Sequence, residues 1–285
     1  MSMLEWSDQN SEDLIKLIKI PPQPEILLAI QTELRKEEPD INTLTKSISQ
    51  DVFLSASVLR ILNSPFFGMR IEIKSVHHAV ALLGMEHVHK LVASIVFRKS
   101  LETNGFTMPR YWDNATDVAR LCSYLARQTG IAVPDVAYTA GLFFDCGIPI
   151  LAQQFDSYRE VLSLQNKEDL DVYTELEDKH FNTNHAVVGF YVTRTWGLPK
   201  ILRDACLLHH DFEYITQDAT DADSACKNLI ILLKIAEHVA GNQRNDAEYE
   251  WQRLKPYILD YLRLSEPDYD DLRNDMLDIL NSGVI

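Results

Sequence analysis

Apolar residues recur along most of the chain at the spacing that places them on one face of an α-helix. Leu54, Val58, Ile61 and Leu62 follow such a spacing, which is typical of an amphipathic helix. Similar faces recur up to the end of the chain, in the segments 88–95, 118–125, 229–236 and 272–280. No segment of the sequence sustains the two-residue alternation with hairpin turns that favours a sheet. The pattern therefore predicts an all-α fold.

Prolines and glycines stand between these periodic segments, where they separate one helix from the next. Pro65 stops a helix because the residue before a proline avoids the helical region. Gly197-Leu198-Pro199 separates two further helices, since proline is tolerated in the first turn of the second one. Residues 102–109 have polar and turn residues without a helical stripe, and they mark a domain boundary.

The boundary divides the chain into two predicted domains. Residues 1–107 form an N-terminal helical bundle, and residues 108–285 form a second helical domain. The tail of the second domain, from about residue 245, is expected to add helices that cover it.

Charge and hydropathy restrict the range of partners. The chain has 27 Lys and Arg residues against 42 Asp and Glu residues, a formal net charge of −15. Because nucleic-acid binding depends on clustered basic side chains, we expect no direct contact with nucleic acid and no binding to an anionic membrane. The N-terminus has no basic signal-peptide region, and the longest aliphatic run, Leu229–Leu233, is too short to span a membrane. These features predict a cytoplasmic location.

Imidazoles and carboxylates gather in the second half of the sequence, near predicted helix ends. Divalent-metal hydrolases need such a set, because nitrogen and oxygen ligands from several helices must converge on ions that activate water. Simpler interpretations stay open, with Asp145 as a helix N-cap and with His209 and His210 at a helix C-terminus. The residues that attract attention are Asp145, His185, His209, His210 and Glu237.

Short motifs in a fixed order make the chain resemble the HDOD family, which is related to HD-type phosphohydrolases and common in bacterial signal transduction. In the N-terminal half they are Ile20–Pro24, Ile48–Asp51, Leu62–Gly68 and Ala79–Gly84. In the second half they are Tyr111–Asn114, Ala140–Gly147, His185, Trp196–Pro199 and His209-His210. The resemblance spans about residues 15 to 245. It implies an all-α protein in which an N-terminal helical bundle is packed on an HD-like helical bundle.

The resemblance also implies a degenerate metal site. Asn114 stands where the hydrolase relatives have a first histidine, and Phe144-Asp145 replaces their His-Asp pair. Phenylalanine has no lone pair for a metal, and an asparagine oxygen is a weak neutral ligand. Glu237 is the nearest match to a late aspartate, and His185, His209 and His210 stand where some relatives have further ligands. The ligand-cleft candidates are Asn114, Phe144, Asp145, His185, His209, His210 and Glu237.

Two functions follow from the resemblance. The first is a non-catalytic signalling module with no catalytic residue and no required cofactor, acting through signalling proteins and a ligand cleft, with homodimer formation through an exposed bundle face left open. The alternative is a residual metal-dependent phosphohydrolase that acts on a nucleotide or cyclic dinucleotide. It requires a divalent metal, for which the candidate ligands are Asp145, His185, His209 and His210. The acidic charge disfavours a third class, a nucleic-acid-associated regulator.

Overall fold

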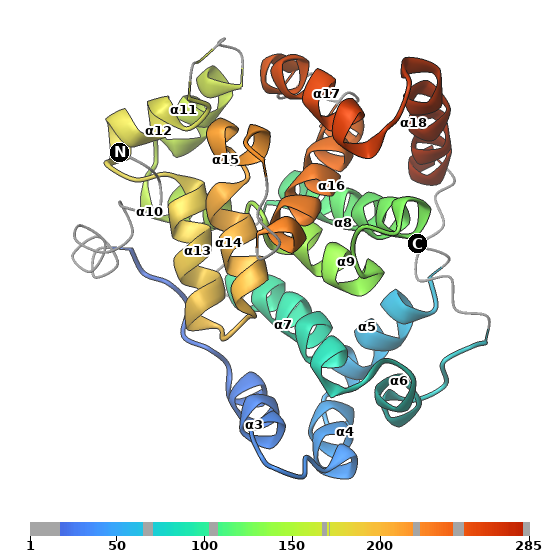
Figure 1. Ribbon diagram of the computed structural model, residues 1–285. Helices are drawn as coiled ribbons and strands as arrows, with labels where there is room; N and C mark the ends of the chain where they lie inside the picture. The colour runs from blue at the N-terminus through green and yellow to red at the C-terminus, as the bar shows by residue number, and fades with distance from the viewer. Residues whose placement is uncertain are drawn as a thin grey trace. The chain divides into compact units, whose positions relative to one another are not determined.

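The computed structural model describes residues 18–64, 71–102, 108–166, 170, 172–218, 223–241 and 248–281. Every regular element within these residues is a helix (Figure 1), and the all-α prediction is confirmed. The family motif at residues 65–68, most of the predicted seam at 103–107 and the predicted start of the tail at 245 lie outside the described residues. The helices group into two compact units, which we call the small unit and the large unit.

The small unit comprises Pro21–Thr107 and a separate segment, Thr195–Leu198. Helix-capping side chains set where its helices begin, because an N-cap acceptor satisfies backbone N–H groups that have no partner inside the helix. Asp40, Asp51 and Ser75 each accept a hydrogen bond from the first turn of the following helix. The helices are α3 (Glu25–Leu34), α4 (Ile41–Ser49), α5 (Val52–Leu62), α6 (Val76–Leu83) and α7 (Met85–Glu102).

The segment Thr195–Leu198 is anchored in the small unit by Trp196, although it lies about a hundred residues further along the chain. The Trp196 indole is fully buried, and its Nε1–H donates to the Pro21 carbonyl at 2.9 Å. Gln31 Nε2 donates to the Trp196 carbonyl at 2.9 Å. Gly197 has a φ of 66°, and a Cβ there would lie 2.2 Å from Gln31 Nε2, so glycine fits both the backbone and the space.

The large unit comprises Met108–Arg194 and Pro199–Gly283, together with residues 18–20. Helix α8 packs along α9, and α16 packs on α8, α9 and α14. The last two helices pack on α16, and α18 also packs on α8. The helices are α8 (Pro109–Thr129), α9 (Pro134–Phe143), α10 (Gly147–Gln154), α11 (Tyr158–Gln165), α12 (Glu175–Phe181), α13 (His185–Thr195), α14 (Lys200–Leu208), α15 (Phe212–Thr216), α16 (Ser224–Gly241), α17 (Glu248–Leu262) and α18 (Glu266–Asn281).

One stretch, Pro134–Gln154, is long and apolar enough to cross a membrane by length and composition alone. However, 83% of its most apolar window is buried inside the protein, and the stretch is divided into α9 and α10 by a turn at residues 144–146. Burial in the core accounts for its apolar character.

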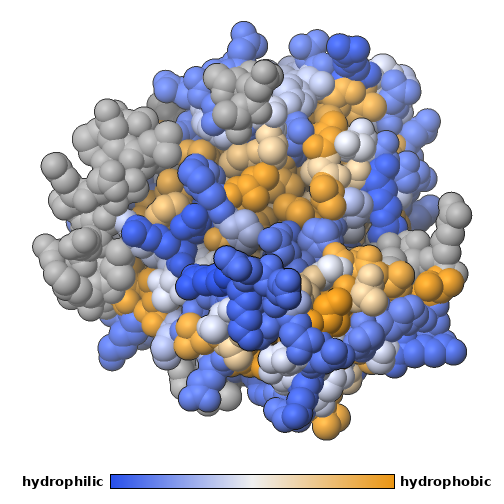
Figure 2. Space-filling model, turned by 60° about the horizontal axis from the view of Figure 1, so that its bottom comes forward, coloured by the Kyte–Doolittle hydropathy of each residue, from blue (hydrophilic) through white to orange (hydrophobic). Residues whose placement is uncertain are grey.

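On the face shown in Figure 2, hydrophilic residues alternate with groups of hydrophobic ones. Val52 and Phe53, in the first turn of α5, are 80% and 57% exposed. The Lys99 ammonium lies 5.2 Å from the centre of the Phe53 ring and 3.2 Å from Asp51 Oδ2. Single exposed apolar residues are ordinary on a protein surface.

Candidate metal centre

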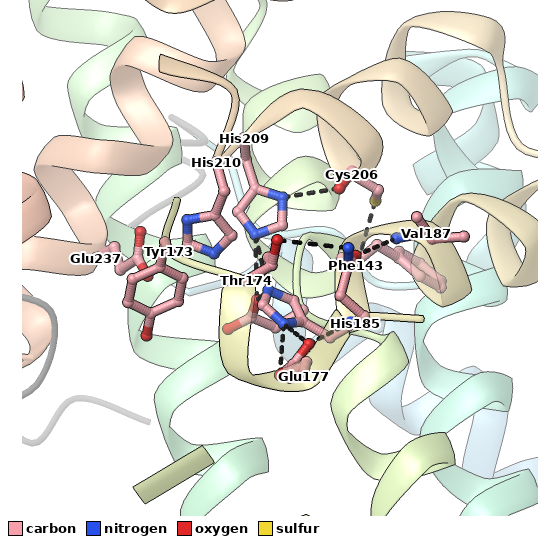
Figure 3. A network of polar contacts seen from close by, with 12 residues as sticks. Phe143, Tyr173, Thr174, Glu177, His185, Val187, Cys206, His209, His210 and Glu237 are labelled. Carbon is pink, nitrogen blue, oxygen red and sulfur yellow. Dashed lines mark hydrogen bonds and ion pairs between the residues drawn. The ribbon is translucent and has the colours of Figure 1, made fainter. Parts of the chain in front are cut away.

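Four side chains predicted as metal ligands lie together in the large unit. Asp145 follows α9, His185 opens α13, and His209 and His210 follow the last turn of α14. One ligand atom from each of the four lies within 4.8 Å of the others, and the three histidines are buried. Figure 3 shows the three imidazoles turned toward one another. Segments far apart in the sequence therefore place three imidazoles and one carboxylate around a single point.

The Asp145 carboxylate faces two of the imidazoles. Its Oδ1 lies 3.4 Å from His185 Nε2 and 3.4 Å from His209 Nε2, and these two nitrogens lie 3.4 Å from each other. Gly147 makes room for this turn, because a Cβ there would lie 2.1 Å from the His185 carbonyl oxygen. Helix α10 has no side-chain N-cap hydrogen bond, so Asp145 is not the helix cap that its sequence position also allowed.

Hydrogen bonds on the far side of two rings fix their orientation. His185 Nδ1 lies 2.9 and 3.0 Å from the two carboxylate oxygens of Glu177, and His209 Nδ1 lies 2.7 Å from the Cys206 carbonyl. Carbonyl and carboxylate oxygens only accept, so both Nδ1 atoms donate. In the neutral form of each ring the Nε2 lone pair then faces Asp145, which is the usual arrangement of metal-binding histidines.

Glu177 is itself held firmly in the core. Its side chain is fully buried and accepts hydrogen bonds from the Tyr158 hydroxyl at 2.7 Å and from the His185 backbone N–H at 2.7 Å. Burial raises the pKa of Glu177, but the charge of His185 and these hydrogen bonds lower it below the usual value. Glu177 is therefore an anion that orients His185.

The third ring, His210, lies between an aromatic side chain and a group of charges. Tyr173 stacks on it, with the ring centres 4.1 Å apart and the planes at 22°. His210 Nδ1 lies 2.8 Å from Glu250 Oε1. Lys234 Nζ donates to Glu250 Oε2 at 2.8 Å and to Glu237 Oε2 at 3.0 Å. Since Lys234 keeps Glu250 in contact with a positive charge, the carboxylate accepts from Nδ1 and leaves Nε2 of His210 for the cleft.

The pKa values of the cluster follow from burial and neighbouring charge. Burial raises the pKa of Asp145 to about 6, against the opposing charges of His185 and Lys234. Burial, together with the charge of Lys234, lowers the pKa of His209 and His210 well below 6.5. Burial also lowers the pKa of His185, but Glu177 overcomes this and raises it to about 9. A cation bound here would find two neutral imidazoles and would displace one proton from His185.

An orphaned polar atom tests whether these residues fit a metal ion. Asp145 Oδ1 is buried and has no hydrogen-bond partner among the described residues, although buried oxygens are nearly always paired. Three imidazoles and one carboxylate are a donor set that suits zinc and other divalent transition ions. The residues therefore fit a divalent metal ion, which would give a direct partner to an oxygen that makes no hydrogen bond within the described residues.

The remaining predicted residues surround this cluster without joining it. Phe144 is buried and meets the His209 ring edge-on, with the ring centres 5.6 Å apart. Asn114 and Glu237 line a cavity of about 580 Å³ together with Asp145, His185 and His210. Glu237 is ion-paired with Lys234. Phe144 thus places a buried apolar ring against His209, at the position where the resemblance implies a histidine in the hydrolase relatives.

Sequence reasoning missed the residues that support the ligands. Glu177, Lys234 and Glu250 are ordinary charged residues on helical segments, and nothing in their spacing distinguishes them from residues on a solvent-exposed face. The available signal for Lys234 is that it interrupts the otherwise apolar run 229–236. A charge at a core position requires a buried partner.

An all-helical unit with histidine and aspartate side chains gathered at its helix ends agrees with the HD-like fold that the resemblance implies. The sequence model of the HDOD domain matches residues 20–212, and the chain belongs to this family. Two curated relatives are both uncharacterized proteins. One, from Treponema pallidum, is 23% identical over 70% of this chain, and one, from Bacillus subtilis, is 31% identical over 39% of it. The matches span 39% and 27% of those relatives' own lengths.

Solved structures of bacterial proteins share the fold. A candidate phosphohydrolase from Shewanella amazonensis has a TM-score of 0.68 at 20% identity, with 95% of each chain covered. An HDOD domain protein of unknown function from Geobacter sulfurreducens has a TM-score of 0.67 at 22% identity, covering 99% of this chain and 98% of the other. A candidate signal transduction protein from Marinobacter aquaeolei has a TM-score of 0.65 at 20% identity, covering 98% and 63%.

Proposed function

We propose that this protein is a cytoplasmic signalling module that binds one divalent metal ion at Asp145, His185, His209 and His210 and acts through contacts with other proteins. The observation that carries the proposal is the convergence of four ligand atoms within 4.8 Å of one another. Among them, Asp145 Oδ1 makes no hydrogen bond within the described residues and faces two Nε2 atoms at 3.4 Å. Without a metal this oxygen has only long contacts to the two rings, of which His185 is charged, and a bound cation would give it a direct partner in place of the His185 proton. The resemblance implies a signalling module that needs no cofactor, and the proposal differs from it by adding one structural metal ion.

A signalling role is supported by how the ligands are connected along the chain. Helix α13 begins at the ligand His185, and α14 leads directly into the ligands His209 and His210. The segment that joins these two helices, Thr195–Leu198, belongs to the small unit. An 11-residue helix such as α13 is a rod of about 16 Å. Occupancy of the metal site is therefore tied covalently to a segment that is anchored in the other unit.

Two side chains next to the cluster, Phe144 and Lys234, disfavour catalysis. Phe144 packs on His209 and excludes a polar ligand from that side. The Lys234 ammonium holds two nearby carboxylates, Glu237 and Glu250. The cavity of about 580 Å³ next to the cluster is nevertheless large enough for a small molecule, and this observation keeps the phosphohydrolase as the second candidate.

Metal analysis tests the proposal directly. The metal-stripped protein is titrated with Mn²⁺ by calorimetry, and bound metal is counted by mass spectrometry. We expect one ion per chain, and we expect Asp145→Ala or His209→Ala to weaken binding at least about 100-fold, because each removes a direct ligand where loss of a supporting residue alone costs about 10–100-fold. His180→Ala is the matched control, since His180 is exposed and lies outside the cluster.

The two candidate functions differ in turnover. The Mn²⁺-loaded protein is assayed against nucleotide phosphates and cyclic dinucleotides, with the Asp145→Ala variant as the blank. The signalling module is expected to show no difference between the two proteins. Hydrolysis that disappears in Asp145→Ala would establish the phosphohydrolase, whereas a wild-type protein that takes up no metal would overturn the metal site itself.

A further inference from the structure

A second group of potential ligands lies directly beside the first. His210, Glu237 and Glu250 offer ligand atoms within 4.8 Å of one another. They come from the end of α14, from α16 and from the start of α17. His210 belongs to both groups, so two cation-sized positions adjoin each other. In two-metal sites the ions lie about 3.5–4 Å apart, so adjoining ligand groups of this kind are what a second ion would need.

A lysine side chain contacts every member of this second group. Lys234 Nζ lies 3.0 Å from Glu237 Oε2, 2.8 Å from Glu250 Oε2 and 3.1 Å from His210 Nδ1. The Lys234 side chain is only 3% exposed. An ammonium is a compact cation with three donors, and here two of them go to the carboxylates of Glu237 and Glu250. The position that a second metal ion would take is thus held by a positive charge of the protein.

We propose that the Lys234 ammonium replaces a second metal ion and limits this protein to one divalent cation. The inference rests on the proposed metal site at Asp145, His185, His209 and His210. A divalent ion among Glu237, Glu250 and His210 would have to displace the ammonium from its carboxylates or lie against a buried like charge, and both are unfavourable. Lys234 at the same time keeps Glu237 and Glu250 compensated when no metal is present.

The consequence is chemical as well as structural. Two ions can clamp the attacking and leaving oxygens of a phosphoryl group, whereas one ion with a fixed ammonium beside it cannot provide that symmetric clamp. Lys234 therefore determines the ion count of the site, and it does so from the apolar face of α16, where a charged residue would otherwise be unexpected.

The test is the number of Mn²⁺ ions bound by wild-type protein and by Lys234→Met, which keeps the length of the side chain and removes its charge. We expect one ion per chain in the wild type and two in Lys234→Met, measured by mass spectrometry after gel filtration. Electron paramagnetic resonance gives an independent readout, because two adjacent Mn²⁺ ions produce an exchange-coupled spectrum and a single ion does not.

Lys227→Met is the matched control. Lys227 lies on the same helix, is also buried and donates to the Gln217 carbonyl between the rings of Tyr257 and Tyr261. It has no contact with the cluster, so this variant is expected to bind one ion. If Lys234→Met does not fold, Lys234→Gln carries the same expectation, because its amide still donates to a carboxylate.

The outcomes separate the two proposals. Two ions in the wild type, or one ion in both Lys234 variants, would overturn the role of Lys234 while leaving the first metal site intact. No ion in the wild type would overturn the proposed metal site. One ion in the wild type and in Lys227→Met, with two coupled ions in a Lys234 variant, supports both.

Discussion

At the residue scale, the arrangement of the cluster depends on groups that never face the cleft. Glu177 and the Cys206 carbonyl accept hydrogen bonds from Nδ1 of His185 and His209, and both Nε2 atoms therefore lie beside Asp145. A supporting carboxylate also raises the basicity of the ring that it holds. Removing such a support should therefore weaken the site without removing a ligand.

Glu177→Gln tests this dependence. The amide oxygen can still accept from His185 Nδ1, but the negative charge beside the ring is gone, so we expect Mn²⁺ affinity to fall about 10–100-fold. Calorimetric titration measures the change. Glu175→Gln is the control, because Glu175 lies on the same helix and pairs with the exposed Lys179, outside the cluster. Equal affinity in Glu177→Gln and wild type would contradict the supporting role.

The four candidate ligands could be named from the sequence because each lies at a family motif or in an apolar context. The supporting residues could not, because a glutamate such as Glu177 belongs to a polar helical pattern until the fold buries it. Lys234 contacts Glu250 across 16 positions of sequence, and no local pattern relates the two. Burial and partner choice are properties of the tertiary structure.

At the element scale, local side chains determine where several helices of the small unit begin. Asp51 accepts from the Leu54 backbone N–H at 3.0 Å and thereby caps α5. This hydrogen bond, with a lesser contribution from Lys99, lowers the pKa of the Asp51 carboxyl below 3.8. A group whose pKa is lowered by folding stabilises the folded state above its unfolded pKa and loses that effect as the pH falls through its folded pKa.

Asp51→Ala is therefore expected to be pH-dependent in its effect. At pH 7 loss of the cap should lower the free energy of unfolding by about 1 kcal/mol. As the pH falls below 3.8, the difference between wild type and variant should shrink. Urea unfolding of wild type and variant at pH 7 and at a pH below 3.8 measures the difference in the free energy of unfolding. Lys99→Ala measures the separate contribution of the exposed Asp51–Lys99 ion pair, which should be small. An effect of Asp51→Ala that does not change with pH would contradict the role of the Asp51 carboxylate as the cap of α5.

The helices could be predicted from the periodicity of apolar residues, but the role of the connection between α13 and α14 could not. Gly197-Leu198-Pro199 is readily recognised as a separator, and α13 ends at Thr195 just before it. The anchoring of Trp196 depends on Pro21, which is 175 positions away in the sequence. Contacts at that separation leave no trace in local propensity, so the sequence predicted a turn where the structure has an anchored segment.

At the scale of the whole molecule, the chain connects the metal centre to the small unit through two helices. A ligand that binds only the folded site stabilises it by about 2.7 kcal/mol at a hundredfold excess over Kd. The same stabilisation applies to any segment that unfolds in the same cooperative step as the metal site. The segment Thr195–Leu198 lies between α13 and α14, whose far ends carry three of the four ligands.

Amide hydrogen exchange with and without Mn²⁺ tests this connection. If Thr195–Leu198 opens together with the metal centre, its exchange should slow by up to about 100-fold at a hundredfold excess of Mn²⁺ over Kd. Helix α6, which carries none of the ligands, serves as the internal reference and is expected to be unchanged. Asp145→Ala should abolish the effect throughout. Protection that is confined to the ligands themselves, with Thr195–Leu198 unaffected, would contradict transmission through α13 and α14.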